Sequence, residues 1–212
     1  MAERLKLNIL NKKRRSLLPL LKEFKEEFYL AGGIALALQV GHRRSEDFDF
    51  FTSDIFDLQA LQEKTRLLLK GFHYSVTQLE KNTYSIIIEE EVKVSFFKIE
   101  QEVILPFMDS EWFRLCNEFE IGAMKIAALL RAAFRDYVDL YFLLKKYKLG
   151  EILSLCEKKY SGFEKSVYLK ALLSYDDIEQ APIQYLEGYE KTPEEIFSFI
   201  EKQTRRFLLY SS

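Results

Sequence analysis

A chain of 212 residues, 48% of them hydrophobic, suits one or two globular domains with a sizeable core and excludes an intrinsically disordered protein. Its formal net charge of −2 creates no global field that attracts nucleic acid, so any RNA contact must use a local basic patch. The two cysteines, Cys116 and Cys156, and the two histidines show no metal-ligand or redox spacing, which argues against a zinc site.

The N-terminal residues 3–27 predict helical structure, with a stripe of apolar residues and Pro19 as a potential kink. The start, M-A-E-R-L-K, lacks the apolar core of a signal peptide, and no run approaches the roughly 20 apolar residues that span a bilayer. We therefore expect a cytoplasmic protein without membrane contact. Four consecutive cations, residues 12–15, cannot all share one helical face. We expect them to lie on a solvated surface, with an RNA backbone contact as the alternative.

A glycine pair follows a short apolar segment. Residues 28–31 predict a buried strand that ends at Gly32 and Gly33, after which residues 34–40 can form one or two helical turns. Glycine lets a backbone approach a ligand closely, and the first free N–H groups of a helix attract phosphate oxygens. The strand, turn and helix therefore form a candidate phosphate site.

Two aspartates interrupt an aromatic run, F-D-F-F, just downstream. If this segment is a strand, its period of two directs Asp47, Asp49 and Ser45 to one face and Phe48 and Phe50 to the other, into a core. Carboxylates on one face can share a hard cation such as Mg²⁺. Acids that are half-buried among aromatic residues need a counter-charge, which a metal or the nearby Arg43 or Arg44 would provide.

Residues 29–51, Y-L-A-G-G-I-A-L-A-L-Q-V-G-H-R-R-S-E-D-F-D-F-F, resemble the signature of the AbiEii/AbiGii-type toxin nucleotidyltransferases, a branch of the polymerase-β-like superfamily. The match is specific because it joins several elements in order. The resemblance implies that the glycine pair holds the phosphates of an NTP and that the two aspartates ligate magnesium. It also implies that Arg43 and Ser45 support the loop ahead of the aspartates.

A helix over residues 58–70 precedes two predicted strands, residues 84–88 and 92–99. In the wider superfamily a third carboxylate stands on the second of these strands, completes a two-metal site and often accepts the proton of the attacking hydroxyl. The segment V-K-V-S-F-F places Ser95 where that acid is expected, and it resembles the version found in a subgroup of short family members. A nearby acid could substitute, although the spacing selects none of Glu89, Glu90, Glu91 and Glu100.

Asn117 and Glu120 predict an N-x-x-E capping box that opens a buried helix, I-G-A-M-K-I-A-A-L-L. Lys125, the cation among these apolar residues, needs an anion within reach or must extend its ammonium group to water. The resemblance implies a contact between Lys125 and the nucleotide phosphates, because A-M-K followed by R-D-Y-V-D-L-Y-F-L-L is similar to the family's downstream motifs.

Further charges continue along the next predicted helix. Arg131, Arg135 and Asp139 recur at steps of four, and Asp136 lies three residues before Asp139. We expect Arg135 and Asp139 to take part in an ion-pair lattice that holds this helix to the first domain. Asp136 remains a candidate for nucleotide binding.

The C-terminal part predicts more helices. Residues 149–175 suit one or two amphipathic helices, and residues 176–191 read as a connecting segment. The sequence T-P-E-E at 192–195 opens a last helix that runs to about Leu209, with threonine as the cap and proline at the first helical position.

These patterns and the resemblance predict an α/β fold: a polymerase-β-like nucleotidyltransferase domain with a small mixed sheet over residues 1–115, followed by a helical domain over residues 116–212. The resemblance implies a Mg²⁺-dependent enzyme that moves a nucleoside monophosphate from an NTP to a hydroxyl acceptor. In toxin relatives that acceptor is the 3′ end of tRNA, so RNA and a partner antitoxin are implied too; a protein or small-molecule hydroxyl stays open. The serine at position 95 motivates an alternative, a nucleotide- or partner-binding module of the same fold with weakened catalysis.

Overall fold

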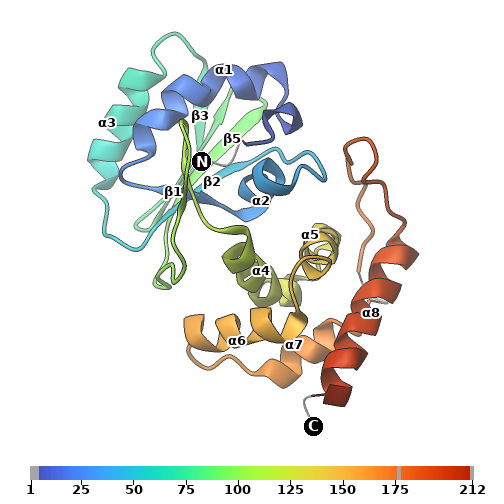
Figure 1. Cartoon of the computed structure of the whole chain (residues 1–212). Helices are drawn as coiled ribbons and strands as arrows, with labels where there is room; N and C mark the ends of the chain where they lie inside the picture. The colour runs from blue at the N-terminus through green and yellow to red at the C-terminus, as the bar shows by residue number, and fades with distance from the viewer. Residues whose placement is uncertain (1–4, 176–177, 211–212) are drawn as a thin grey trace. The chain divides into compact units, whose positions relative to one another are not determined.

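The computed structural model describes residues 5–175 and 178–210, which fold into two compact units (Figure 1). Unit 1 takes in the chain up to residue 102 together with residues 106–116, and unit 2 takes in residues 103–105 and the chain from residue 117 onward. The boundary expected from the sequence lies between residues 115 and 116. That expectation did not include the assignment of residues 103–105 to the helical unit.

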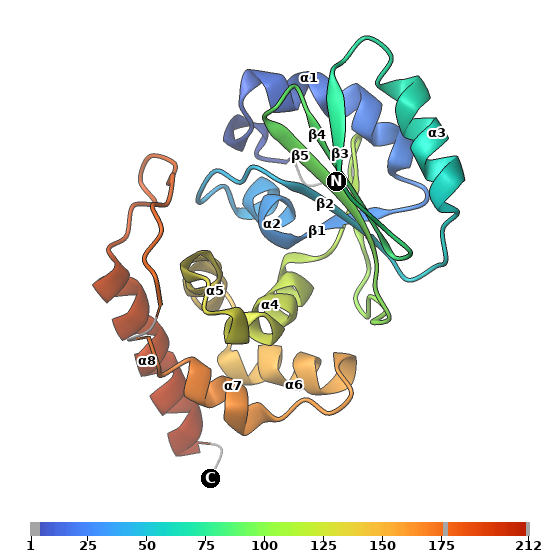
Figure 2. The same cartoon turned by 180° about the vertical axis from the view of Figure 1, so that it is seen from behind.

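Unit 1 is built on a mixed sheet. The strands of the described residues are β1 (Tyr29–Ala31), β2 (Phe48–Thr52), β3 (Tyr74–Glu80), β4 (Thr83–Ile88), β5 (Val92–Lys98), β6 (Met108–Asp109) and β7 (Arg114–Leu115). Their order across the sheet is β3-β4-β5-β2-β1-β7-β6, and β3, β4 and β5 lie side by side at one edge (Figures 1 and 2). The β2–β5 and β1–β7 pairs are parallel and the other pairs are antiparallel. The predicted α/β class with a mixed sheet is confirmed.

The described helices of unit 1 are η1 (Leu7–Ile9), α1 (Lys12–Leu21), η2 (Lys22–Phe24), α2 (Gly32–Val40) and α3 (Leu58–Leu68). The single helical pattern predicted at the N-terminus is thus divided into three pieces. The side chain of Asn11 caps α1 by accepting a hydrogen bond from the Arg14 N–H, and Pro19 lies inside α1 without ending it at once. The helix predicted over residues 58–70 is α3, and the side chain of Asp57 caps it.

Aromatic rings form the core on one face of the sheet. Phe50 of β2 stacks on Phe96 of β5 with ring centroids 5.3 Å apart. Phe24 and Phe28 pack on Phe96 with centroid distances of 4.8 and 5.1 Å, and all four rings are buried. Burial of large aromatic rings is a major stabilising term, so it decides which face of β2 points inward. The residues that alternate with these phenylalanines must therefore use the other face.

Unit 2 is helical. Its described helices are α4 (Glu118–Ala127), η3 (Leu129–Arg131), α5 (Phe134–Leu144), α6 (Leu149–Lys159), α7 (Lys165–Ala171) and α8 (Pro193–Tyr210). Their apolar faces form one buried cluster that includes residues of α4, α5, α6 and α8. At the start of α8, Thr192 Oγ1 accepts from the Glu195 N–H, and a Glu195 carboxylate oxygen accepts from the Thr192 N–H, so the predicted cap is confirmed.

The capping box predicted for α4 is half wrong. Asn117 accepts a hydrogen bond from the Phe119 N–H, as a cap should. The carboxylate of Glu120 instead accepts from the N–H groups of Ile104 and Leu105, and its Oε1 lies 2.6 Å from Lys159 Nζ. Glu120 is fully buried, so its charge requires these partners. The bonds also explain why residues 103–105 belong to unit 2.

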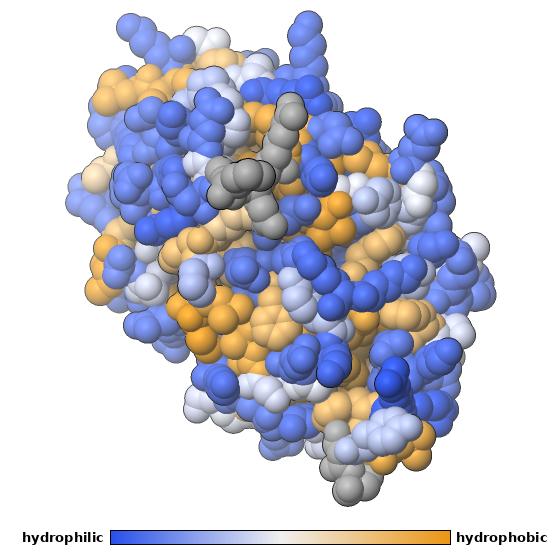
Figure 3. All heavy atoms as spheres, viewed as in Figure 1, coloured by the Kyte–Doolittle hydropathy of each residue, from blue (hydrophilic) through white to orange (hydrophobic). Residues whose placement is uncertain are grey.

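Hydrophilic residues cover most of the face seen in Figure 3, with hydrophobic patches between them. At the end of α8, Leu208, Leu209 and Tyr210 leave apolar atoms exposed. Within the described parts of the chain, none of the helices has both the length and the apolar character that crossing a membrane requires.

Candidate active site

The glycine pair forms the junction between β1 and α2. The helix starts at Gly32, two residues earlier than predicted, and Gly32 has a left-handed φ of +73° that favours glycine. A Cβ atom on Gly32 would lie 3.3 Å from Asp49 Oδ2. A Cβ atom on Gly33 would lie 2.9 Å from Arg43 Nη2 and 3.0 Å from Ser45 Oγ. Because Gly32 and Gly33 have no side chains, three predicted site residues can lie against the turn: Arg43, Ser45 and Asp49.

The two aspartates lie on the face of β2 opposite the aromatic core. Phe48 and Phe50 are buried, whereas Asp47, just before the strand, and Asp49, within it, are half-buried. The antiparallel register pairs Asp49 with Ala31, which directly precedes the glycine turn. The alternation expected from the sequence therefore places Asp49 beside the Gly32-Gly33 turn, the candidate phosphate site. Partly exposed carboxylate oxygens suit a hard cation such as Mg²⁺.

Arg43 and Ser45 come from the segment that leads into β2. Arg43 is buried, and its Nη1 donates to the Arg44 carbonyl at 3.0 Å, which fixes the guanidinium next to its own loop. The structure therefore brings Gly32, Gly33, Arg43, Ser45 and Asp49 together at the start of α2. The arginine and the helix N-terminus favour an anionic ligand at this corner, and Asp49 places a carboxylate beside the same turn.

Ser95 is the neighbour of Asp49 on the next strand. The parallel register of β2 and β5 pairs Asp49 with Ser95, so the two side chains point to the same face. Ser95 is fully buried, and the Ser85 hydroxyl of β4 donates to Ser95 Oγ at 3.1 Å. At the position where the resemblance expects a third carboxylate, the sheet holds two hydroxyl groups bonded to each other.

The neighbouring glutamates have other partners. Glu89 accepts from the His73 N–H, and Glu91 accepts from Asn11 and lies 2.6 Å from Lys13 Nζ. Glu89 and Glu90 have left-handed φ values in the turn between β4 and β5. Among the residues that the structure describes, no three His, Cys, Asp or Glu side chains form a group suited to a metal ion.

Arg14 is a positioning residue that the sequence interpretation missed. The four cations of residues 12–15 were expected on a solvated surface, yet Arg14 is only 5% exposed. Its Nε donates to the Glu46 carbonyl at 2.9 Å, and its Nη1 lies 3.1 Å from Glu91 Oε1. Arg14 therefore holds the backbone that directly precedes Asp47. The sequence did contain an indication that Arg14 is buried, because helical spacing places it on the same face of α1 as Leu17, Leu18 and Leu21.

Lys125 obtains its counter-charge inside unit 2. It is 5% exposed, and its Nζ lies 2.7 Å from Asp136 Oδ1 and 2.6 Å from Asp139 Oδ2. Arg131 donates to both carboxylate oxygens of Asp136. The alternative in which the ammonium group extends to water is therefore wrong.

The ion-pair network on α5 contains other residues than the sequence predicted. Asp139 takes part through Lys125, whereas Arg135 is exposed. The pairs join α4 and η3 to α5, which are all elements of unit 2. Asp136 is fully buried in this network.

Comparison with known proteins identifies the family. The family described as "Nucleotidyl transferase AbiEii toxin, Type IV TA system" matches residues 19–207. An uncharacterized protein of Aquifex aeolicus (strain VF5) is 30% identical over 189 residues, which cover 86% of this chain and 88% of that protein.

Two crystal structures from Helicobacter pylori share the fold at lower identity. One is described by its name only as a nucleotidyltransferase. It aligns with a TM-score of 0.61 and 16% identity, and the alignment covers 95% of this chain and 97% of the Helicobacter pylori chain. The other, JHP933, has a TM-score of 0.58 and 17% identity and covers 98% of this chain and 96% of its own. These two structures show the fold, and the family match over residues 19–207 shows that the chain belongs to the AbiEii family of nucleotidyltransferase toxins.

Proposed function

We propose that this protein is an active, Mg²⁺-dependent nucleotidyltransferase that moves a nucleoside monophosphate from an NTP to a hydroxyl acceptor. One observation carries the proposal: Asp49, Arg43 and Ser45 converge on the Gly32-Gly33 turn. Membership in the AbiEii family supports the reaction class.

The start of α2 would bind the triphosphate. Ala31, the N-cap residue, has no side chain that can accept a hydrogen bond, and the first turn carries no acid. The N-cap side chain therefore does not occupy the first N–H groups of the helix, which would donate to phosphate oxygens, and the helix dipole favours negative charge there. Arg43 adds a fixed positive charge beside the same turn, and the glycine backbone allows close approach.

Asp47 and Asp49 would hold Mg²⁺, because a pair of half-exposed carboxylates beside a phosphate site matches the ligands that this ion prefers. When bound, the ion neutralises charge on the phosphates. The acceptor hydroxyl oxygen attacks the α-phosphorus in line and its proton passes to solvent, while the bond to the bridging oxygen breaks and pyrophosphate leaves with the electron pair. The protein's part is to orient these groups and exclude competing geometries.

Turnover is expected to be slow. A carboxylate beside Asp49 would accept the proton of the attacking hydroxyl, but Ser95 and Ser85 occupy that place. The contact between Lys125 and the leaving group stays a prediction of the resemblance, since two carboxylates already neutralise its ammonium group. Arg43 and the start of α2 are the better candidates for that charge.

We further propose an RNA acceptor, with the 3′ end of tRNA as the first candidate, a cognate antitoxin and a cytoplasmic location. The support is the name of the family, which places its members in a type IV toxin–antitoxin system. The test is incubation of the protein with each labelled NTP, Mg²⁺ and total tRNA, with a chelator as control. Label in RNA supports the proposal, whereas label in protein or a small molecule assigns a different acceptor.

A second function is favoured by the Ser95–Ser85 hydrogen bond. In this alternative the fold binds a nucleotide or a partner without catalysing transfer. Calorimetry distinguishes the two functions: Mg²⁺-dependent NTP binding without label transfer or pyrophosphate release would establish the binding module and reject the enzyme.

A further inference from the structure

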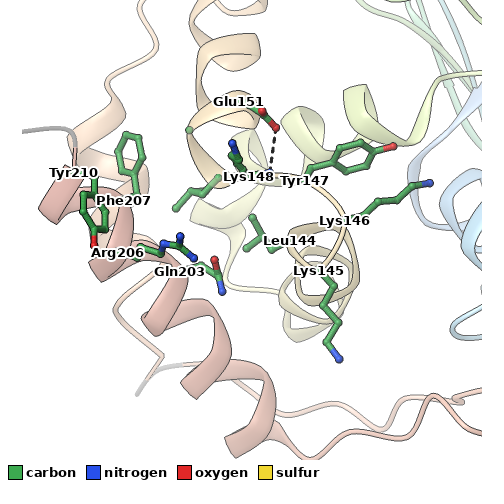
Figure 4. A pocket seen from close by; sticks show the side chains of 12 residues that line it. Leu144, Lys145, Lys146, Tyr147, Lys148, Glu151, Gln203, Arg206, Phe207 and Tyr210 are labelled. Atoms are coloured by element: carbon green, nitrogen blue, oxygen red, sulfur yellow. Dashed lines mark hydrogen bonds between the residues drawn. The ribbon is translucent and has the colours of Figure 1, made fainter.

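A cavity of about 600 Å³ opens in unit 2, apart from the residues described above (Figure 4). Its wall comes from two places: the segment 144–151, which joins α5 to α6, and the C-terminal half of α8. The first residues of α6, Leu149 to Glu151, belong to this wall, so the positive end of a helix contributes to it. The cavity is large enough for a nucleotide-sized group.

Four of the twelve residues that line the cavity are cationic. Lys145, Lys146, Lys148 and Arg206 line the cavity against a single acid, Glu151. The Glu151 carboxylate accepts a hydrogen bond from the Lys148 N–H, drawn as a dashed line in Figure 4. Lys146 pairs with Glu118, but among the described residues neither Lys148 nor Arg206 has an ion-pair partner. The wall therefore carries excess positive charge in a protein whose net charge is −2.

Aromatic rings stand beside these cations. Tyr210 is 82% exposed on the wall, next to Phe207, whose ring packs on Gly150. Arg206 and Tyr210 also line an adjoining hollow of about 550 Å³, together with Lys202 and the Arg205–Glu201 ion pair of the same helix. Arg206 follows Lys202 by about one helical turn. Two cations one helical turn apart, beside the exposed ring of Tyr210, suit a nucleic-acid strand with successive phosphates and bases better than a single phosphate group.

We propose that this pocket binds single-stranded RNA, with Lys148 and Arg206 on successive phosphates and a base stacked on Tyr210. Positive grooves with exposed aromatic rings are the common solution for single strands, because every base has a stacking face. An acidic protein segment would use the cations but would gain little from the ring. The choice of RNA over DNA rests on the proposed function, since the pocket would then hold part of the acceptor.

The test measures binding of a fluorescein-labelled oligouridine to the full chain by anisotropy. Combined Lys148→Gln and Arg206→Gln should weaken binding about tenfold and reduce the slope of log affinity against log salt by about 1.4 for two lost phosphate contacts. Tyr210→Ala should weaken binding about fivefold with the salt slope unchanged. The matched control is combined Lys158→Gln and Lys170→Gln, which removes two exposed charges from α6 and α7 of the same unit.

Each outcome decides the proposal. Equal losses in the pocket and control variants, or binding as tight to a duplex as to the single strand, would overturn it. So would an unaltered chain that binds no RNA, and the pocket would then be tested against acidic peptides. A competing UTP that displaces the oligonucleotide at stoichiometric concentration would reassign the site to a free nucleotide. RNA binding in this pocket does not depend on Asp47 or Asp49. If the variants change RNA binding as expected but the protein transfers no label, only the proposed enzyme activity is rejected.

Discussion

Replacement of Gly33 by alanine separates folding from function at the proposed phosphate site. Gly33 lies in the first turn of α2, and its φ is not in the left-handed region. The added Cβ would meet Arg43 Nη2 at 2.9 Å and Ser45 Oγ at 3.0 Å. Because favourable contacts lie near about 3.5–4.0 Å, the two side chains must move by about half an ångström or more.

The energetic terms nearly cancel for stability but not for activity. Alanine in a helix is favoured over glycine by about 1 kcal/mol, which offsets part of the crowding, so we expect a change in unfolding free energy within about 1 kcal/mol. The displaced Arg43 would no longer match the phosphates. A misplacement of this size should reduce NTP affinity and transfer about tenfold, equivalent to about 1.4 kcal/mol.

The assay combines urea unfolding with calorimetry of NTP binding in Mg²⁺. Gly32→Ala should lose stability as well, by about 1–2 kcal/mol, because its φ is +73° and its Cβ would approach Asp49 Oδ2 at 3.3 Å. Gly162→Ala is the matched control, with φ +74° and open space around the Cβ, and it should lose only stability. Parental NTP affinity in Gly33→Ala would refute the proposed phosphate contact.

Three further predictions test the remaining assignments. Asp47→Ala combined with Asp49→Ala should abolish Mg²⁺-dependent NTP binding in calorimetry while the far-UV circular dichroism spectrum stays that of the folded protein, whereas the exposed Asp54→Ala should bind normally. Unchanged affinity in the double variant would reject the metal assignment. Lys125→Met should cost about 3–5 kcal/mol in urea unfolding because two buried carboxylates each lose one charge partner, and a selective loss of triphosphate over monophosphate binding would instead restore its predicted phosphate contact. Ser95→Asp should raise the single-turnover transfer rate despite reduced stability, and a folded variant with an unchanged rate would place the base elsewhere.

The glycine turn and the aspartate pair could be predicted because their signals are local. A strand period of two separates Asp49 from Phe48 and Phe50 without knowledge of any distant residue, and the structure places them on opposite faces as expected. The cap of α8 was predictable for the same reason, since Thr192 and Glu195 satisfy each other within one turn.

Partners across the fold could not be predicted. The hydrogen bond between Ser85 and Ser95 depends on the register of β4 with β5, and the burial of Arg14 depends on Glu46 and Glu91, which lie far along the chain. Strand β3 escaped prediction because its residues are exposed or half-exposed at the edge of the sheet, which removes the apolar alternation that marks a strand.

The binding of residues 103–105 to Glu120 has a practical consequence for dissecting this protein. Because the chain leaves the sheet unit, contributes a short segment to the helices and returns before residue 106, the units are joined by more than one covalent crossing. A shortened protein that stops at residue 116 would strip Ile104 and Leu105 of the acceptor for their N–H groups. A fragment that begins at residue 117 would leave the Glu120 carboxylate buried with Lys159 alone. Clean separation would need a circularly rearranged gene or a peptide supplied in trans, and isolated halves should be expected to precipitate.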